Sequence, residues 1–334
     1  MEKKANLKQA SQLIQASQRP LLICHISPDG DAVGCLTGLG LALRQMGLQP
    51  ILACSDPIPH RFHYVPAVES VVQEVSDPFD LVVSLDSSDP RRLGRFPQMP
   101  AFGRAPLLNI DHHLTNLNFG TVNLVDHHAS SAAEVVLRLL EYMGLPIDAD
   151  VATCLLTGIV TDTRGFRTSN VTIQVMEAAL RLMKAGASLP YITHNGLDRR
   201  PTAVILLWRA ALASLQIEDR VIWASIPLAM RRAVGYAGNG DAGLASFLIS
   251  ADDADVAAVF VEVEDGRIEV GLRAVPGFDV ARVALQLGGG GHVLAAGCTL
   301  PGPLEEAQAQ MLAALQADLT CQRHAQDQRH EGDL

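Results

Sequence analysis

Two identical triplets of titratable residues stand out in this sequence, Asp111-His112-His113 and Asp126-His127-His128. The residues before the first triplet, 106–110, are mostly apolar, as in a central strand of a parallel sheet, whereas 121–125 alternate like an exposed edge strand. The pattern Ser131-Ala-Ala-Glu134 is a capping box, which makes the second triplet the approach to a helix. We therefore assign chemistry to the first triplet and expect the histidines of the second to be bystanders, at most at the rim of a site.

Other titratable side chains also follow apolar runs, which in a parallel sheet is where ligands collect. They are His25, Asp29, Asp31, Asp86 and Asp162. Several carboxylates converging in one buried place repel one another and need a cation to offset their charge. Nitrogen and oxygen ligands without sulfur suit Mn²⁺, with Mg²⁺ or Fe²⁺ as competitors, and two ions could share one bridging carboxylate.

The elements that must position these residues form an α/β pattern. Continuous apolar strands are expected at 20–25, 50–54, within 68–75, at 79–85 and at 106–110, with a helix at 31–46 and, beyond residue 126, helices at 131–143, 149–160 and 170–185. Uninterrupted apolar strands alternating with helices predict a parallel sheet covered on both faces.

A second, smaller α/β domain is expected after a stretch rich in turn formers. We place the first domain at 1–187, a linker at 188–201, the second domain at 202–321 and a disordered tail at 322–334. The second domain should contain a helix at 202–214, a strand at 220–226, a hairpin of 255–263 and 267–275 around Asp265-Gly266, and helices near 279–287 and 304–318.

Composition narrows the class of protein. A net charge of −10 disfavours a grip on long nucleic acid, although arginines could still build a pocket for a small phosphorylated substrate. The six cysteines form no Cys-x-x-Cys pair, which argues against a disulfide framework and a thiolate zinc site. No segment has the length of a membrane span or the pattern of a signal peptide, so we expect a cytoplasmic protein with no membrane partner.

Taken together, the motifs resemble those of a known family. His25-x-x-Pro28-Asp29-Gly30-Asp31, the isolated Asp86, Asp111-His112-His113 and Thr161-Asp162-Thr163 are similar, in order, to the four motifs of the DHH phosphoesterases. Gly-Leu-Arg273 and Gly288-Gly-Gly-Gly-His292-x-x-Ala295-Ala296-Gly297 are similar to the DHHA1 domain. The similarity covers nearly the whole chain. With no added domain, the chain most resembles the bacterial nano-RNases, which are oligoribonucleases and phosphatases of 3′-phosphoadenosine 5′-phosphate (PAP).

The resemblance implies a role for each residue. One Mn²⁺ would be held by His25, Asp29 and Asp86, and the other by Asp31, Asp86, His112 and Asp162. His113 would face the scissile phosphate as charge stabiliser or proton donor, and Asp111 would orient a histidine ligand. In the second domain, the phosphate of the terminal nucleotide would be bound by Arg273 and His292, with an anion nest formed by Gly289, Gly290 and Gly291.

Two departures from the family pattern are present. This chain has Asp126-His127 where the family commonly has Asp-Pro, and Arg164 between Thr163 and Gly165 where the family usually has glycine directly. We expect Arg164 to project into solvent.

The resulting prediction is a metal-dependent phosphoesterase that hydrolyses RNAs of about two to five nucleotides to mononucleotides and removes the 3′-phosphate of PAP, with a homodimer as a possible assembly. Its partners would be short RNA or DNA oligonucleotides and nucleotide bisphosphates.

Cleavage of linear or cyclic dinucleotides and a single-strand exonuclease are alternatives, the latter disfavoured by the acidic charge. Inorganic pyrophosphatase shares the first domain type, but the glycine-rich run at His292 favours a nucleotide. A non-catalytic nucleotide-binding protein is the alternative from another class, and the intact ligand set opposes it.

Overall fold

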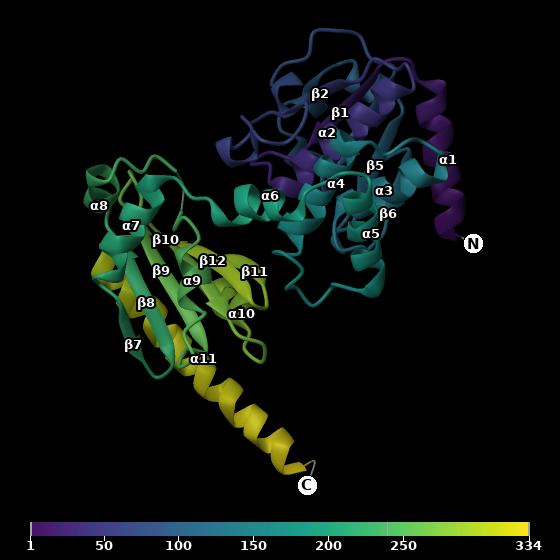
Figure 1. Cartoon of the computed structure of the whole chain (residues 1–334). Helices are drawn as coiled ribbons and strands as arrows, with labels where there is room; N and C mark the ends of the chain where they lie inside the picture. Colours follow the sequence, from purple (N-terminus) through teal and green to yellow (C-terminus); the bar gives the residue numbers. More distant parts are fainter. Residues whose placement is uncertain (1, 239, 333–334) are drawn as a thin grey trace. The chain divides into compact units, whose positions relative to one another are not determined.

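The computed structural model describes residues 2–238 and 240–332, and the chain divides into two compact units, Met1–Arg199 and Arg200–Leu334 (Figure 1). The first unit is built on a six-stranded sheet with the order β3-β2-β1-β4-β5-β6, in which every neighbouring pair is parallel. Its strands are β1 (Pro20–Cys24), β2 (Ile51–Ala53), β3 (Val71–Val72), β4 (Leu81–Leu85), β5 (Leu107–Asp111) and β6 (Val122–Val125). The parallel sheet predicted from the apolar runs is confirmed, and β6 is its edge strand, as the alternating pattern indicated.

Both faces of this sheet are covered, but by different kinds of structure. One face packs on helices α1 (Glu2–Ala16), α2 (Gly30–Gln45) and α3 (Ala132–Tyr142), and α4 (Ala149–Asp162) and α5 (Ile173–Lys184) pack on these helices in turn. The other face is covered by short 3₁₀ turns, which supply Leu93 and Phe96 to a smaller apolar cluster with Leu21, Ile23 and Val82. Burial on both faces explains why β1, β4 and β5 are apolar almost throughout.

Two glycines let α2 and α4 approach closely. A Cβ on Gly34 would lie 2.4 Å from the carbonyl oxygen of Cys154, and a Cβ on Gly158 would lie 2.5 Å from Oδ1 of Asp31. Contacts shorter than 3 Å are not tolerated by real Cβ atoms, so this crossing requires glycine on both helices. The close crossing brings Asp31, near the start of α2, toward Asp162, the last residue of α4.

The second unit contains a mixed sheet with the order β11-β12-β10-β9-β8-β7, in which β8 and β9 are parallel and the other pairs antiparallel. Its strands are β7 (Gln216–Glu218), β8 (Val221–Ile226), β9 (Val256–Glu262), β10 (Ile268–Ala274), β11 (Gly290–His292) and β12 (Ala295–Leu300). Helices α10 (Val280–Gln286) and α11 (Leu304–Gly332) pack on one face, and α7 (Thr202–Leu212) and α9 (Leu244–Leu248) on the other; α8 (Leu228–Ala233) follows β8. The hairpin predicted around Asp265-Gly266 is confirmed as β9 and β10. β12 was not predicted, because Ala-Ala-Gly-Cys-Thr-Leu contains few residues that favour strands.

The stretch expected to be a linker, 188–201, is mostly helical and belongs to the first unit up to Arg199. Ser188 caps α6 (Leu189–Thr193) by accepting a hydrogen bond from the backbone of Tyr191, and a π-helical turn, His194–Asp198, follows. Ile192 is fully buried in the core of the first unit. Its burial fixes the position of a segment whose composition alone suggested a loop.

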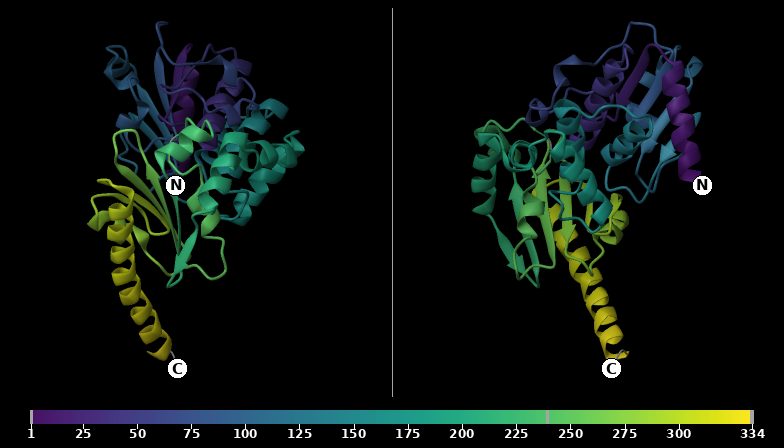
Figure 2. Two further views of the ribbon diagram at one scale, coloured as in Figure 1. Left: turned by 90° about the vertical axis from the view of Figure 1, so that its left-hand side faces the viewer. Right: turned by 45° about the vertical axis from the view of Figure 1, so that its right-hand side comes forward.

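The segment expected to be a disordered tail, 322–334, is helical in its described part, because α11 continues to Gly332 (Figure 2). The extension begins with two anchored residues: the side chain of Gln322 bonds both backbone groups of Asp279, and Arg323 forms an ion pair with Asp255 over 3.0 Å. The residues that follow contain no proline and no glycine before Gly332, so nothing local ends the helix. Residues 333 and 334 of the predicted tail lie outside the described residues. None of the helices in the described part of the chain combines the length and apolar character needed to cross a membrane.

Candidate metal centre

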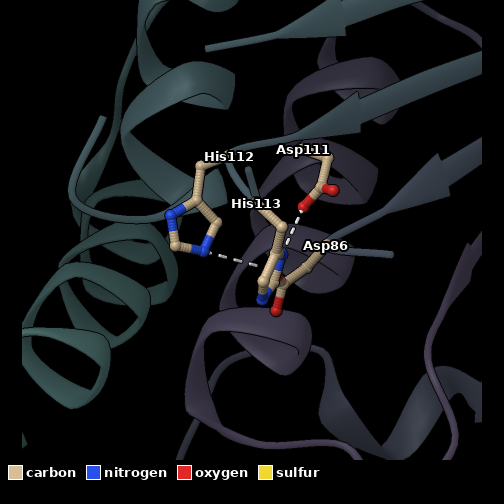
Figure 3. A group of neighbouring side chains, drawn as sticks. All are labelled: Asp86, Asp111, His112 and His113. Atoms are coloured by element: carbon tan, nitrogen blue, oxygen red, sulfur yellow. Dashed lines mark hydrogen bonds and ion pairs between the residues drawn. The ribbon is translucent and has the colours of Figure 1, made fainter. Parts of the chain in front are cut away.

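The carboxyl ends of β1, β4 and β5 meet at one edge, because these strands are neighbours in the sheet. His25 follows β1, Asp86 follows β4, and Asp111 ends β5 immediately before His112 and His113. Figure 3 shows the carboxylate of Asp86 beside the imidazole of His113, with His112 and Asp111 on opposite sides of that ring. The first triplet therefore lies where the parallel sheet collects its ligands.

All the metal ligands implied by the sequence motifs come together around Asp86. Their ligand atoms form overlapping groups in which all atoms lie within 4.8 Å of one another: His25, Asp29 and Asp86; Asp31, His112 and Asp162; and Asp86, Asp111, His112 and His113. Nε2 of His25 lies 3.5 Å from Oδ2 of Asp86, and Nε2 of His112 lies 3.7 Å from Oδ1 of the same carboxylate. Nε2 of His112 also lies 3.6 Å from Oδ2 of Asp162. Asp86 thus joins two neighbouring groups, as a bridging carboxylate would.

Asp86 itself has the features of a ligand held in place for a cation. It is 2% exposed, and its φ of +54° lies in the left-handed region, which is uncommon and costly for a residue other than glycine. Its Oδ1 is buried and accepts no hydrogen bond from any described residue. An unsatisfied buried acceptor costs about 1–3 kcal/mol. A divalent cation between Asp86 and the imidazoles would satisfy this oxygen, so the residues present fit a metal site.

The electrostatics of the cluster differ from one carboxylate to the next. Burial raises the pKa of Asp162 to about 6, with attraction from His112 opposing this rise and repulsion from Asp86 and Asp29 adding to it. Burial, with repulsion from the same neighbours and Asp162, also raises the pKa of Asp31 well above its ordinary value. Burial likewise disfavours ionisation of Asp29, but the hydrogen bond and charge of His25 and two backbone N–H groups lower its pKa to about 2.

The neighbours of His25 favour its protonated form. Burial works against its charged form, but hydrogen bonds and attraction from Asp29 and Asp86 outweigh burial and raise its pKa to about 10. Its Nδ1 lies 2.7 Å from the carbonyl oxygen of Ile26, to which it can donate, and this leaves Nε2 facing the two carboxylates. A backbone acceptor on the second nitrogen is the usual arrangement for a histidine ligand.

Asp31 has a structural role in addition to its place in the cluster. Its two oxygens accept hydrogen bonds from the backbone N–H groups of Ala132 and Ala133, at 2.6 and 2.9 Å, in the first turn of α3. The free N–H groups and the dipole of a helix N-terminus favour a negative charge there. Asp31 therefore fixes α3 to the site, a function that its sequence context does not indicate.

Asp111 orients His113 and not the predicted metal ligand His112. Nδ1 of His113 lies 2.8 Å from Oδ1 of Asp111, and Nδ2 of Asn116 donates to Oδ2 over 2.5 Å. The hydrogen bond to Asp111 raises the pKa of His113, and burial only partly opposes it. Burial disfavours the Asp111 carboxylate, but His113 and Asn116 outweigh that and lower its pKa. The two shifts favour the ionised form of Asp111 and the protonated form of His113.

The second triplet has a different environment. Asp126 is buried and its Oδ2 accepts a hydrogen bond from Nη1 of Arg138 over 2.5 Å. Arg138 also pairs with Glu134 on the same helix. His127 and His128 are both exposed, and neither is in a group of possible metal ligands within the described residues. Arg164, the other departure from the family pattern, is exposed as well.

In the second unit, the residues expected to bind substrate are only partly arranged as predicted. Arg273 donates from Nε to Oγ of Ser246 over 3.1 Å, which fixes the guanidinium, and His292 is exposed at the end of β11. The predicted anion nest is wrong for Gly289, whose N–H donates to the carbonyl oxygen of Ala284 over 2.7 Å. Gly290 and Gly291 form the edge strand β11 and pair with β12, and their part in a nest stays a prediction. A strand formed here because β12, which the sequence did not reveal, offers a partner for these glycines.

A cavity of about 150 Å³ opens beside the cluster, and part of its lining was missed by the sequence analysis. It is lined by Asp29, Gly30, Arg61, Phe62, Thr161, Asp162, Gly196 and Leu197. Arg61 was detectable, since it lies in the loop after β2, and such loops line the ligand edge of a parallel sheet. Arg92 also reaches the site, since its Nη2 is 3.1 Å from Nδ1 of His25. The sequence around Arg92 and Asn116 contains no pattern that would have predicted a place in the site for either residue.

Comparison with known proteins agrees with these features. Residues 20–159 match the model of the DHH family, N-terminal domain, and residues 233–320 match the DHHA1 domain. The chain is 32% identical to the bifunctional oligoribonuclease and PAP phosphatase NrnA of Thermus thermophilus over 94% of both chains. It is 26% identical to the protein of the same name from Bacillus subtilis, covering 83% of this chain and 87% of the relative.

Solved structures show the same fold. An exopolyphosphatase-related protein from Bacteroides fragilis superposes with a TM-score of 0.89 at 23% identity, covering 96% of this chain and 98% of that one. RecJ of Thermus thermophilus, in complex with Mn²⁺, superposes with a TM-score of 0.54 at 16% identity, covering 93% of this chain and 55% of that one.

Replacing the two candidate histidines separately tests which triplet binds metal. His112→Ala should weaken Mn²⁺ binding at one site by more than about 100-fold, beyond the loss typical of residues that only support a ligand. His127→Ala should leave the affinity within about two-fold, because His127 is exposed and away from the cluster. Isothermal titration calorimetry measures both, and the reverse result would move the metal centre to the second triplet.

Metal binding should also release a proton. The pKa of His25, raised to about 10, keeps the free imidazole charged at pH 8, and a ligand must be neutral, so about one proton should leave His25 as Mn²⁺ binds. Affinity should therefore rise with pH, and it should fall most steeply below about pH 6, where Asp162 takes up a proton. The dependence of the calorimetric enthalpy on buffer ionisation measures the release, and His25→Gln should reduce it by about one proton. An enthalpy independent of the buffer in the wild type would contradict this assignment.

Proposed function

This chain belongs to the DHH family of bifunctional oligoribonucleases and PAP phosphatases, and on that premise we propose that it hydrolyses short oligoribonucleotides to mononucleotides and removes the 3′-phosphate of PAP. The observation that carries the proposal is the cluster of imidazoles and carboxylates around Asp86, whose Oδ1 has no hydrogen-bond donor among the described residues. Such a set of metal-ligating side chains is suited to the hydrolysis of phosphate esters. The names of the relatives describe enzymes of the same class.

The proposed cofactor is a pair of Mn²⁺ ions, with Mg²⁺ or Fe²⁺ as alternatives. One set of ligands would be His25, Asp29 and Asp86, and the other Asp31, His112 and Asp162. Asp86, whose Oδ1 lies 3.7 Å from Nε2 of His112, would be shared by both sets. When bound, such ions supply Lewis-acid activation of water and neutralise charge on the phosphate. The oxygen and nitrogen donors of this set suit Mn²⁺ better than a metal that prefers sulfur.

His113 has the position and charge of a proton donor. Its Nδ1 is held by Asp111, and its side chain is 35% exposed, so Nε2 can face a substrate at the edge of the cluster. The raised pKa favours the protonated form of this imidazole, which could stabilise charge on the phosphate or give its proton to the leaving oxygen. Asn116 and Asp111 keep the ring in the orientation that this role needs.

Arg273 and His292 of the second unit are proposed to bind the phosphate of the terminal nucleotide. The guanidinium is fixed by Ser246 and by the carbonyl oxygen of Leu272, so little side-chain entropy remains to be lost when it binds a phosphate. The net charge of −10 supports short substrates, since long nucleic acids are usually held through many phosphate contacts. A cytoplasmic homodimer completes the proposal, and equilibrium sedimentation measures the assembly state.

The proposed activity is tested with four substrates in the presence of Mn²⁺: a pentanucleotide, PAP, a dinucleotide and a long RNA. The wild type should release mononucleotides from a labelled pentanucleotide and phosphate from PAP, and should act poorly on an RNA of about 24 nucleotides. Asp86→Asn should lose more than about 100-fold in both activities, because it removes charge from the shared carboxylate. Absence of metal-dependent release would leave a non-catalytic nucleotide-binding protein as the better reading. Preference for the long RNA would favour a single-strand exonuclease, and a dinucleotide cleaved in preference to both would favour a dinucleotide phosphodiesterase.

Arg273→Ala tests whether phosphate binding by the second unit is separate from metal binding by the first. Loss of a charge-assisted contact to phosphate, worth about 1.5–3 kcal/mol, should raise KM for PAP and for the pentanucleotide by about 10- to 100-fold. Mn²⁺ affinity should not change, because Arg273 is not among the metal-ligand groups. Arg267→Ala is the matched control, an exposed arginine of the same hairpin that pairs with Asp265. Loss of Mn²⁺ binding in Arg273→Ala would show that the two roles are not separated.

A further inference from the structure

Two stacked aromatic rings in the second unit have no part in the function proposed above. Phe247 on α9 lies against Trp208 on α7, with ring centroids 5.3 Å apart and ring planes inclined by 28°. The guanidinium of Arg200 lies 5.2 Å from the centroid of the Trp208 ring, in a cation–π contact. All three residues belong to the second unit. We call Phe247 and Trp208 the aromatic platform.

Phe247 is the exposed member of the platform. It is 48% exposed, and among the exposed large hydrophobic residues described in the second unit it is the only aromatic one. Three other residues of α9, Leu244, Ala245 and Leu248, are buried in an apolar cluster. Phe247 therefore faces solvent with a π surface that the second unit leaves uncovered.

Trp208 fixes the orientation of the exposed ring. The indole is half-buried and packs against the same apolar cluster. Its Nε1 is buried and has no hydrogen-bond partner among the described residues, so packing and stacking set its position. A ring that is already held by a second ring loses little side-chain freedom when a ligand stacks on it.

The platform adjoins the residue proposed to bind phosphate. Ser246, which precedes Phe247 on α9, accepts a hydrogen bond from Nε of Arg273 over 3.1 Å. Ser246 and Phe247 are both exposed, and the Cα atoms of consecutive residues are about 3.8 Å apart. In a nucleotide, a single ribose separates the phosphate from the base. We therefore expect a nucleotide held at its phosphate by Arg273 to have its base within reach of Phe247.

An exposed phenyl ring suits the base of such a ligand. Every nucleobase has a π face, so aromatic side chains bind bases by stacking with little regard to sequence. Phenylalanine has no polar atom with which to read the edge of a base. A platform of this kind adds affinity for a nucleotide without selecting its base, as an enzyme acting on short oligonucleotides of mixed sequence requires.

We propose that Phe247 stacks on the base of the nucleotide whose phosphate Arg273 binds, and that Trp208 is the positioning residue for its ring. The inference rests on the proposed function, in which Arg273 binds the phosphate of the terminal nucleotide. The ligand of the second unit is then a whole nucleoside phosphate, and the base contributes to its binding.

The test removes the ring and the base separately. Its two substrates are PAP and an abasic analogue of PAP, in which hydrogen replaces the adenine. In the wild type, kcat/KM for PAP should exceed that for the analogue by about 5- to 150-fold, the range expected for one stacked base. Phe247→Ala should lower kcat/KM for PAP by a similar factor and change that for the analogue by less than about two-fold.

Two further variants separate stacking from packing. Phe247→Tyr keeps the ring and should retain kcat/KM for PAP within about two-fold, whereas Phe247→Leu keeps apolar volume on Trp208 and should lose most of the preference for PAP. Leu285→Ala is the matched control, since Leu285 is an exposed apolar residue on α10, which packs on the opposite face of the same sheet. It should leave both substrates unaffected.

Binding without metal provides a second measurement. Isothermal titration calorimetry in the presence of a chelator compares adenosine 5′-monophosphate (AMP) with ribose 5-phosphate, which lacks the base. The wild type should bind AMP more tightly by about 5- to 150-fold, and Phe247→Ala should remove this difference.

The other outcomes overturn the inference or the proposed function, and they are distinguishable. Equal losses on PAP and on its abasic analogue in Phe247→Ala would show that the ring supports the phosphate site and not the base. Full activity of Phe247→Ala on PAP would show that no base stacks there, while the proposed function would stand. A wild type that hydrolyses neither PAP nor the pentanucleotide, yet prefers AMP to ribose 5-phosphate through Phe247, would overturn the proposed function and leave the base site.

Discussion

Mutual repulsion among buried carboxylates is the constraint on which the catalytic unit depends. Asp31 and Asp86 are almost completely buried, and Asp162 lies near both, so their negative charges cannot all persist without compensation. In the metal-free cluster, the compensation comes from a charged His25 and from raised pKa values at Asp31 and Asp162. A site organised in this way releases protons when a cation binds. Its affinity for the cation therefore depends on pH, because both are determined by the same repulsion among the carboxylates.

The parts of the site that the sequence predicted are those governed by a general rule of parallel sheets. His25, Asp86 and the first triplet each follow an apolar strand, and carboxyl ends of neighbouring parallel strands share one edge. Asp162 follows a helix, and its approach to Asp31 depends on the crossing of α2 and α4. That crossing requires glycine at positions 34 and 158, which are visible in the sequence but reveal nothing about the partner helix. Asp162 was predicted because it follows an apolar run and matches a family motif, and neither observation identifies the helix that brings it to Asp31.

The errors share a physical cause, which is that a partner distant in sequence decides the outcome. Asp111 bonds His113 because strand β5 ends at Asp111 and Asn116 holds its other oxygen, so no spacing rule assigns it to His112. The glycine run forms β11 because β12 lies beside it, and the supposed linker is helical because Ile192 is buried in the core. Local composition indicated flexibility in both segments, and tertiary contacts removed it.

The two Asp-His-His triplets show why only one of them calls for a metal. Asp126 and Glu134 are buried, and Arg138 supplies a permanent positive charge to both. The ion-pair partners of Asp86 among the described residues are His25, His112 and His113, whose charge depends on a proton and is lost whenever they serve as ligands. At the second triplet, the guanidinium of Arg138 neutralises Asp126 and Glu134, so these carboxylates need no metal cation. A set of titratable partners cannot do so once its histidines are neutral, and a divalent ion at Asp86 would supply the positive charge that they no longer provide.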